Sequence, residues 1–265
     1  MEQEWQLEVH GVRGSFPRSD PDEYGGNTSC LSLRAGEAVI ALDAGSGLSS
    51  FGRALAGDPT GHRVHILITH FHMDHILGLF SFAPFFDPGW EVCLYGLPGL
   101  RRAIESLICP PYWPVTVPDF DALVTYTEVV PGNHYDLDGV RMTAYPGCHP
   151  GDALYYRLDG AGKSLVYALD CEPDAGFLPG LTAFARDCGL LIWDANFAPG
   201  TLRPGWGHST WAQGLEAARL AGARRVMMTH YNHSYDSAFL RKQEDLARMQ
   251  NPDCIFAREG MVEKL

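Results

Sequence analysis

The segment THFHMDHILG, residues 69–78, holds the side chains in this sequence that are best suited to chemistry. His70 and His72 are two residues apart and follow an apolar run that predicts a buried strand, so both side chains should point the same way. Asp74 and His75 come next, where we expect the chain to turn into a helix near Ile76. Imidazole and carboxylate groups suit a divalent ion, zinc first, with manganese or iron as alternatives. One ion rarely takes four ligands from so short a piece, so the run predicts two ions.

Three further candidate ligands each follow a predicted strand elsewhere in the chain. They are His149 after VRMTAYPGC, Asp170 at the end of SLVYALD and His230 at the end of RRVMMTH. A rigid metal site requires ligands that are delivered from such strand ends. A single histidine is more often a surface or core residue, but several polar groups left without a partner at a buried strand end would be costly. The pattern therefore favours a metal centre.

Composition and charge narrow the class of protein. The 265 residues are 46% hydrophobic, which fits one large domain. There is no apolar run long enough to cross a bilayer, and the acidic start MEQEWQLEVH is unlike a signal peptide, so we expect no membrane association. Seven scattered cysteines without a CxxC pair suit a cytoplasmic location. The net charge of −12 disfavours long nucleic acid as a substrate and leaves a small anion, because a metal centre supplies its own positive charge.

The order of strand and helix signals predicts an α/β fold. Strand-like runs dominate the first half, and helices are expected at about 48–56, 76–80, 98–107, 176–186, 210–221 and 237–250. This order is typical of two packed sheets with helices outside. The segment at about 81–120, rich in proline and aromatic residues, is interpreted as a partly irregular insertion in a single domain of residues 1–265. It is either an ordinary surface excursion or a wall or lid over a site.

Several residues are candidates for substrate contact. Aromatic residues of the insertion would form a pocket for a nucleobase or an aryl group, although each is also a core candidate: Phe82, Phe85, Phe86, Tyr112 and Trp113. Asn27, in YGGNTS, is expected to face the site from the first hairpin. Asp194, at the end of a strand, is expected to support ligands from behind.

The run HFHMDH, followed by His149, Asp170 and His230, resembles the signature of the metallo-β-lactamase superfamily. The resemblance covers nearly the whole chain, including GNTSCLSLRAGEAVIALDAGSGL with its Asp-x-Gly turn at 43–45. It implies a four-layer αββα sandwich with the metals at one edge. It also implies one ion on His70, His72 and His149, a second ion on Asp74, His75 and His230, and Asp170 as the bridge.

The stretch GHST, residues 207–210, leads into a predicted helix and then a strand ending in TH. This arrangement resembles the phosphodiesterase branch of the superfamily, which contains tRNA 3′-processing endonucleases, the phosphodiesterase of the carbon–phosphorus lyase pathway and cyclic-nucleotide phosphodiesterase-like enzymes. The resemblance implies that His208 lies beside the metals and contacts the phosphoryl group; anchoring of the next helix is the alternative. No basic arm like the one with which the endonucleases clasp tRNA is found, so a small substrate is expected.

Three functions remain open at this point. The first is a phosphodiesterase for a small or cyclic nucleotide-like diester, in which Asp74 steers the attacking water and His208 protonates the leaving oxygen. The second is a lactone or thioester hydrolase on the same centre, and the third is a non-catalytic metal-binding scaffold. GHST favours the first of these. A homodimer is left open, because nothing in the residues decides it.

Overall fold

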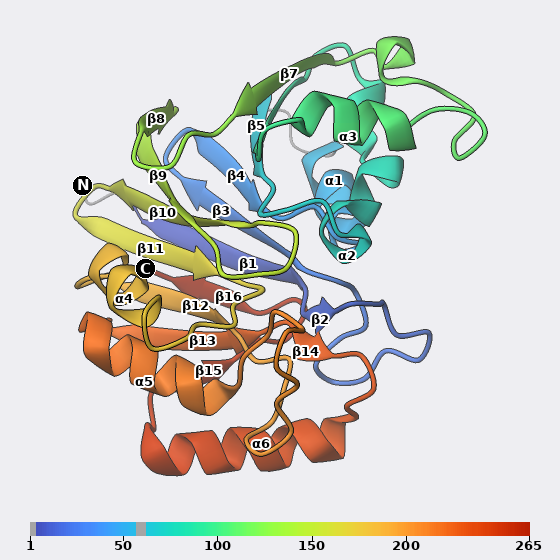
Figure 1. Ribbon diagram of the computed structural model, residues 1–265. Coiled ribbons are helices and arrows are strands. Elements are labelled where there is room, and N and C mark those ends of the chain that lie inside the picture. The colour runs from blue at the N-terminus through green and yellow to red at the C-terminus, as the bar shows by residue number, and fades with distance from the viewer. Residues whose placement is uncertain (1–3, 57–61) are drawn as a thin grey trace.

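Two seven-stranded sheets packed face to face form the centre of the computed structural model, which describes residues 4–56 and 62–265 (Figure 1). The first sheet has the order β16 (Val262–Lys264), β1 (Trp5–Gly11), β3 (Cys30–Ala35), β4 (Ala38–Leu42), β5 (Arg63–Leu67), β6 (Glu91–Gly96) and β7 (Leu123–Glu128). The second has the order β15 (Cys254–Phe256), β13 (Arg225–Thr229), β12 (Leu190–Asp194), β11 (Lys163–Ala168), β10 (Leu154–Gly160), β9 (Val140–Pro146) and β8 (His134–Leu137). A short parallel pair joins β2 (Arg13–Gly14) to β14 (Tyr231–Asn232).

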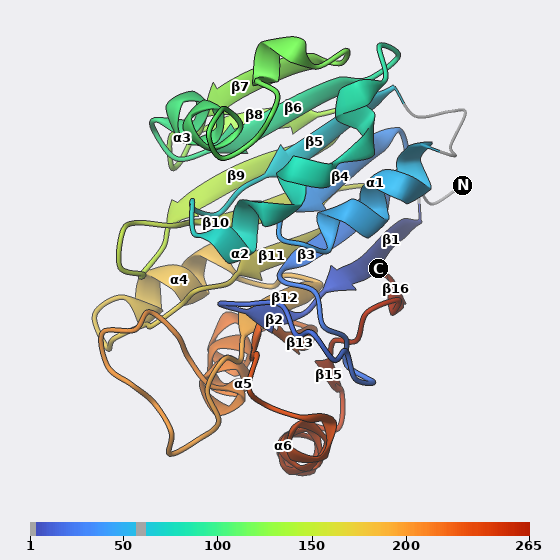
Figure 2. The same cartoon turned by 90° about the vertical axis from the view of Figure 1, so that its right-hand side faces the viewer.

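Helices cover the outer face of each sheet (Figures 1 and 2). Those over the first sheet are α1 (Leu48–Ala56), α2 (Met73–Ile76) and α3 (Leu100–Leu107). Those over the second are α4 (Leu178–Phe184), α5 (Trp211–Ala221) and α6 (Ser237–Gln250). The layers are helix, sheet, sheet and helix, which confirms the predicted αββα sandwich.

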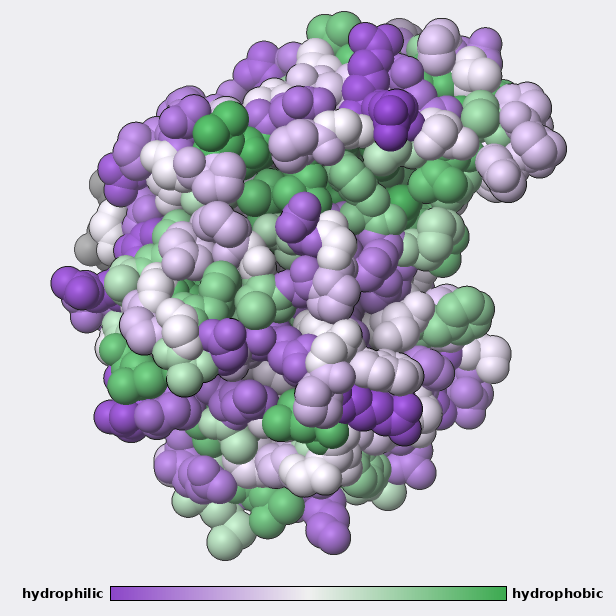
Figure 3. All heavy atoms as spheres, in the orientation of Figure 1, coloured by the Kyte–Doolittle hydropathy of each residue, from purple (hydrophilic) through white to green (hydrophobic). Residues whose placement is uncertain are grey.

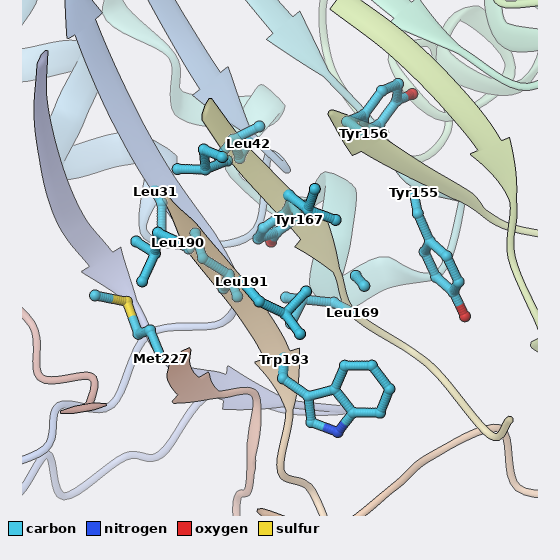
Figure 4. Close-up of a cluster of buried hydrophobic side chains, with 14 of the residues drawn as sticks. Leu31, Leu42, Tyr155, Tyr156, Tyr167, Leu169, Leu190, Leu191, Trp193 and Met227 are labelled. Atoms are coloured by element: carbon cyan, nitrogen blue, oxygen red, sulfur yellow. The ribbon is translucent and has the colours of Figure 1, made fainter. Parts of the chain in front are cut away.

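Both faces of the central strands are buried, which explains why their sequences are apolar without interruption. In β4, Ile40 and Leu42 belong to the cluster between the sheets, whereas Val39 and Ala41 belong to the cluster under α1 and α3. Figure 4 shows that the cluster between the sheets draws Leu31 and Leu42 from the first sheet and other side chains from β10 to β13. This shared core supports the prediction of a single domain.

The segment at about 81–120 is part of the first sheet, and the prediction of an insertion over that whole span is corrected. Its strand β6 pairs in parallel with β5 on one side and β7 on the other, with Leu94 opposite Ile66 and Tyr126. The irregular parts are residues 82–90, with a 3-10 turn at Ala83–Phe86, and the stretch after α3, with a 3-10 turn at Val117–Asp119. The pattern of proline and aromatic residues was misleading because these residues pack under α1 and α3 in a hydrophobic layer of their own.

Two helix starts matter for the site. The helix expected near Ile76 begins at Met73, with His72 in an extended conformation before it, so Asp74 and His75 lie in its first turn. Helix α5 begins with a capping box in which the Thr210 side chain accepts the Gln213 N–H and the Gln213 side chain accepts the Thr210 N–H. Among the helices of the described residues, none has the length and apolar character to cross a membrane.

Candidate metal centre

The predicted ligands converge at one edge of the sandwich, where α2 lies close to β2 and β14 (Figures 1 and 2). His70 follows β5, His149 follows β9, Asp170 follows β11 and His230 follows β13. The ligand atoms form four overlapping groups, within each of which all atoms lie within 4.8 Å of one another. These groups are His70–His72–His149, His70–His75–Asp170, Asp74–His75–His230 and Asp170–His208–His230.

Asp170 lies between two clusters of histidines. Its Oδ2 is 3.0 Å from His75 Nε2 and 3.2 Å from His230 Nε2. Its Oδ1 is 3.8 Å from His149 Nε2, which belongs to the other cluster. In that cluster His72 Nδ1 is 3.2 Å from His149 Nε2. A carboxylate with one oxygen toward each cluster has the geometry of a bridge between two ions.

Three buried atoms of this group make no hydrogen bond: His75 Nε2, Asp170 Oδ2 and His230 Nε2. An unpaired buried polar atom costs about 1–3 kcal/mol, so three that converge on one point indicate a missing partner. Imidazole nitrogen and carboxylate oxygen are ligands that zinc and similar ions accept. The residues present therefore fit a divalent cation.

The charges around His75 also call for a cation. Burial lowers the pKa of His75, but the carboxylates of Asp43, Asp170 and Asp74 outweigh it and raise this pKa well above the ordinary value. Burial raises the pKa of Asp170, whereas His230 and His75 bring it well below the usual range. A histidine must lose the proton from the nitrogen that binds a metal ion. Without an ion, a proton on His75 therefore takes the place that the ion would have.

Contacts behind the histidines fix which nitrogen faces the centre. In three of them Nδ1 is held by the protein, so Nε2 points inward. The contacts are Asp43 Oδ2 to His75 Nδ1 at 2.7 Å, Ser29 Oγ to His230 Nδ1 at 2.7 Å and Gly207 O to His149 Nδ1 at 2.9 Å. The sequence alone indicated no role for these three residues, although each lies in a recognisable motif. Ser29 lies in GNTSC, Asp43 in the Asp-x-Gly turn and Gly207 in GHST.

The backbone at the centre is held in an uncommon conformation. Asp43, Asp170 and His230 have φ of 59°, 53° and 63°, in the left-handed region that residues other than glycine rarely adopt. Such conformations persist only when the surroundings impose them, and they cluster at functional sites. Gly207 is needed for a different reason: a Cβ on it would lie 2.0 Å from His149 Nδ1.

His208 lies beside the centre, as the resemblance implied. Its Nδ1 is 3.0 Å from Asp194 Oδ2 and 3.5 Å from Asp170 Oδ1, so two carboxylates face this nitrogen. Burial lowers the pKa of His208, but Asp194, then Asp170 and Asp74, raise it to about 9. These carboxylates therefore favour the protonated form of the imidazole. Asp194 thus holds His208 in position, whereas the sequence predicted that Asp194 would hold a metal ligand.

The other predicted substrate contacts are Asn27, Phe85 and Trp113. Asn27 is engaged within the fold, since its Nδ2 donates to Glu259 Oε2 at 3.1 Å and its Oδ1 accepts from Ser46 at 3.0 Å. Phe85 is 1% exposed, so it belongs to the core and is not available to a substrate. Trp113 is half-buried and packs on the same hydrophobic cluster. Phe85 therefore does not line the predicted pocket, whereas a substrate contact for Trp113 stays a prediction.

Known proteins resemble this chain over its full length. It is 25% identical to a ribonuclease Z of Methanopyrus kandleri, with 100% of this chain and 99% of that protein covered. It is 24% identical to the probable metallo-hydrolase YhfI of Bacillus subtilis, with 97% and 98% covered, and the crystal structure of YhfI superposes with a TM-score of 0.74 over 99% of this chain and all of that one, at 19% identity. A diphosphatase from the PhnP family superposes with a TM-score of 0.73 at 20% identity, with 98% of each chain covered.

The similarity to a ribonuclease Z corrects the prediction, made from the net charge, that long nucleic acid is disfavoured as a substrate. A relative that covers this whole chain is an enzyme of RNA, so the net charge of −12 does not by itself exclude a nucleic-acid substrate. The charge describes the average surface, whereas substrate contact depends on the few groups around the metal centre.

The family model for the beta-lactamase superfamily domain matches residues 40–231. That span contains all seven predicted metal ligands together with His208. It confirms the resemblance inferred from HxHxDH and the later His, Asp and His: the chain belongs to the beta-lactamase superfamily.

Proposed function

We propose that this metal-dependent hydrolase cleaves small, nucleotide-like phosphodiesters at a centre of two divalent ions, with zinc as the expected metal. One ion is assigned to His70, His72 and His149 and the other to Asp74, His75 and His230, with Asp170 between them. The observation that carries the proposal is the position of His208, whose Nδ1 is held by Asp194 at 3.0 Å and lies 3.5 Å from the proposed bridge. A protonated imidazole in that place serves a reaction in which negative charge develops on phosphoryl oxygens.

Each side chain has a defined part in this reaction. Two bound ions would supply Lewis acidity toward the phosphoryl oxygens and lower the pKa of the attacking water. Asp74 orients that water, and its Oδ2 is itself held by the Ser15 N–H at 2.7 Å. His208 binds a phosphoryl oxygen and then gives its Nε2 proton to the leaving oxygen.

The preference for a small substrate is supported by two arginines of β2 and the loop after it. Arg13 is fully buried and pairs with Asp22 at 2.7 Å. Arg18 donates to the carbonyl oxygens of His233 and Tyr235, each at 3.1 Å. Because these guanidinium groups are engaged inside the fold, they are not displayed along a track for a polyphosphate backbone. A ribonuclease-like preference is the competing outcome of the test below.

The test compares substrates on protein that has been stripped with a chelator and reloaded with Zn²⁺ or Mn²⁺. We expect metal-dependent hydrolysis of bis(p-nitrophenyl) phosphate and of cyclic nucleotides, faster than cleavage of an RNA with a 3′ extension. His208→Ala should lower kcat about 10²- to 10⁴-fold with unchanged metal content. His134→Ala, which removes an exposed histidine on β8, is the control.

Four results would contradict parts of the proposal. A lactone or thioester turned over far faster than any diester would make the centre a hydrolase of carboxylic substrates. Faster cleavage of the RNA would agree with phosphodiester hydrolysis but would overturn the preference for a small substrate. Full activity of His208→Ala would remove the role given to this histidine. Metal content below one ion per chain after loading would overturn the binuclear centre.

A further inference from the structure

Two exposed aromatic side chains belong to residues that border the candidate metal centre. Phe16 is 66% exposed and Trp206 is 58% exposed. Phe16 follows Ser15, whose N–H donates to Asp74 Oδ2 at 2.7 Å. Trp206 precedes Gly207, whose carbonyl oxygen is 2.9 Å from His149 Nδ1. Each aromatic residue is thus the chain neighbour of a residue that contacts a proposed metal ligand. The Cα atoms of such neighbours are about 3.8 Å apart.

The backbone around Trp206 is held in place. The carboxylate of Glu172 accepts the N–H of Gly205 at 2.8 Å and that of Gly207 at 2.6 Å, on either side of the tryptophan. Glu172 itself is two residues after Asp170. The backbone on both sides of Trp206 is therefore held by the same segment that delivers the proposed bridging carboxylate.

The surroundings of the indole suit a planar, electron-rich ligand. The guanidinium carbon of Arg203 lies 4.8 Å from the centroid of the Trp206 ring. The segment FAPGTLRPGWG, residues 197–207, contains this arginine and no acidic residue, in a chain of net charge −12. Stacking on an aromatic ring that is backed by an arginine is the usual way in which proteins hold an unpaired base.

Phe16 is held on the other loop that borders the centre. Its ring meets the ring of His233 edge to face at 6.5 Å, and the pairing of β2 with β14 joins these two loops. Figure 3 shows the surface hollowed on its right-hand side, between the part of the molecule that carries α2 and α3 and the loops below it. Figure 2 views the molecule from this side. In it, the loop after β12 lies to the left of β2 and the loop after β2 lies to the right.

We propose that Trp206 and Phe16 bind the planar ring of the substrate, so that the diester carries a nucleobase. This assignment rests on the proposed phosphodiesterase function and deepens it. It also places ring recognition on the loops after β12 and β2, away from the aromatic residues of the segment at 81–120. The phosphoryl group lies at the metal centre and the base lies against the indole face opposite Arg203.

Two esters with the same leaving group test the assignment: thymidine 5′-(p-nitrophenyl) phosphate and methyl p-nitrophenyl phosphate. One stacked base is worth ~1–3 kcal/mol, so Trp206→Ala should lower kcat/KM for the thymidine ester about 5- to 150-fold. The methyl ester should change less than about twofold, because it has no base to stack. Trp206→Phe should restore most of the loss, and Phe16→Ala should show a smaller loss of the same kind. Met249→Ala, which removes a side chain that is 82% exposed on α6, is the control.

Equal losses on both esters, or no loss on either, would overturn the assignment while leaving the diesterase reaction in place. A second measurement does not depend on turnover: calorimetric binding of thymidine 5′-monophosphate and of inorganic phosphate to the metal-loaded protein. We expect the nucleotide to bind more tightly than phosphate, and Trp206→Ala to remove that advantage. If neither ester is hydrolysed but the advantage is present, the proposed reaction fails and the ring site stands. If the nucleotide has no advantage over phosphate, the ring site is wrong.

Discussion

Replacement of Ser29 by alanine tests whether the contacts behind the histidines create the metal affinity. The hydroxyl of Ser29 lies 2.7 Å from His230 Nδ1, and the His230 Nε2 on the opposite side of the ring is one of the three unpaired buried atoms. Removing the hydroxyl leaves the ring free to tilt and removes the group that selects its tautomer. Loss of such a contact usually costs about 10- to 100-fold in metal affinity. Loss of one net hydrogen bond should also lower the free energy of unfolding by about 1 kcal/mol.

A matched control lies three residues along the chain. Ser32 is a buried serine whose hydroxyl is 2.8 Å from Nε2 of a buried histidine, His10, which is not a candidate ligand. Burial lowers the pKa of His10 to about 4, so its imidazole is neutral near pH 7. Ser32→Ala should therefore cost a similar free energy of unfolding without weakening the binding of metal.

The assay has two parts. Urea unfolding of the metal-free proteins measures the loss of stability, and competition with a chromogenic chelator measures Zn²⁺ affinity. We expect both variants to lose about 1 kcal/mol and only Ser29→Ala to lose affinity. Unchanged affinity in Ser29→Ala, or an equal loss in Ser32→Ala, would refute the reasoning that the hydrogen bond acts through His230.

Three further predictions follow from the site and the core. Gly207→Ala should displace His149, because the new Cβ would lie 2.0 Å from its Nδ1; metal analysis should show loss of one ion, and two retained ions would contradict the assignment. Asp194→Asn should shift the alkaline limb of the pH–kcat profile to lower pH, because this carboxylate opposes the effect of burial in raising the pKa of His208 to about 9, and the donor works only while protonated; an unmoved limb would exclude His208 as the donor. Phe85→Ala should lower the free energy of unfolding by about 3–5 kcal/mol with an unchanged KM, and a raised KM would return Phe85 to the substrate site.

The metal centre could be predicted from the sequence because its ligands follow rules of local geometry. His70 and His72 are two residues apart at a strand end, and His149, Asp170 and His230 each follow another strand. In a sheet with parallel neighbours, such as β11, β12 and β13, successive strand ends meet at one edge. Within the second sheet, convergence of Asp170 and His230 therefore follows from strand assignment, whereas their meeting with His70 of the first sheet depends on the packing of the two sheets.

The substrate contacts could not be predicted in this way. Phe85 and Trp113 have the composition of a binding pocket, but whether an aromatic ring is core or surface depends on what packs over it. Asn27 has a polar side chain near the right strands, yet its hydrogen bonds go to Glu259, which is 232 residues away in the chain. Contacts over such separations leave no local pattern in the sequence.

The sequence by itself determined the layers of the fold, the candidate ligands and the family, because periodicity and ligand type are properties of short segments. Only the tertiary structure decided how those ligands are oriented and what surrounds them. It placed Ser29 behind His230, Asp194 behind His208, and Phe16 and Trp206 at the open edge of the centre. The physical reason is that each of these relations depends on loops from different parts of the chain being packed side by side, and that packing is fixed by the core as a whole.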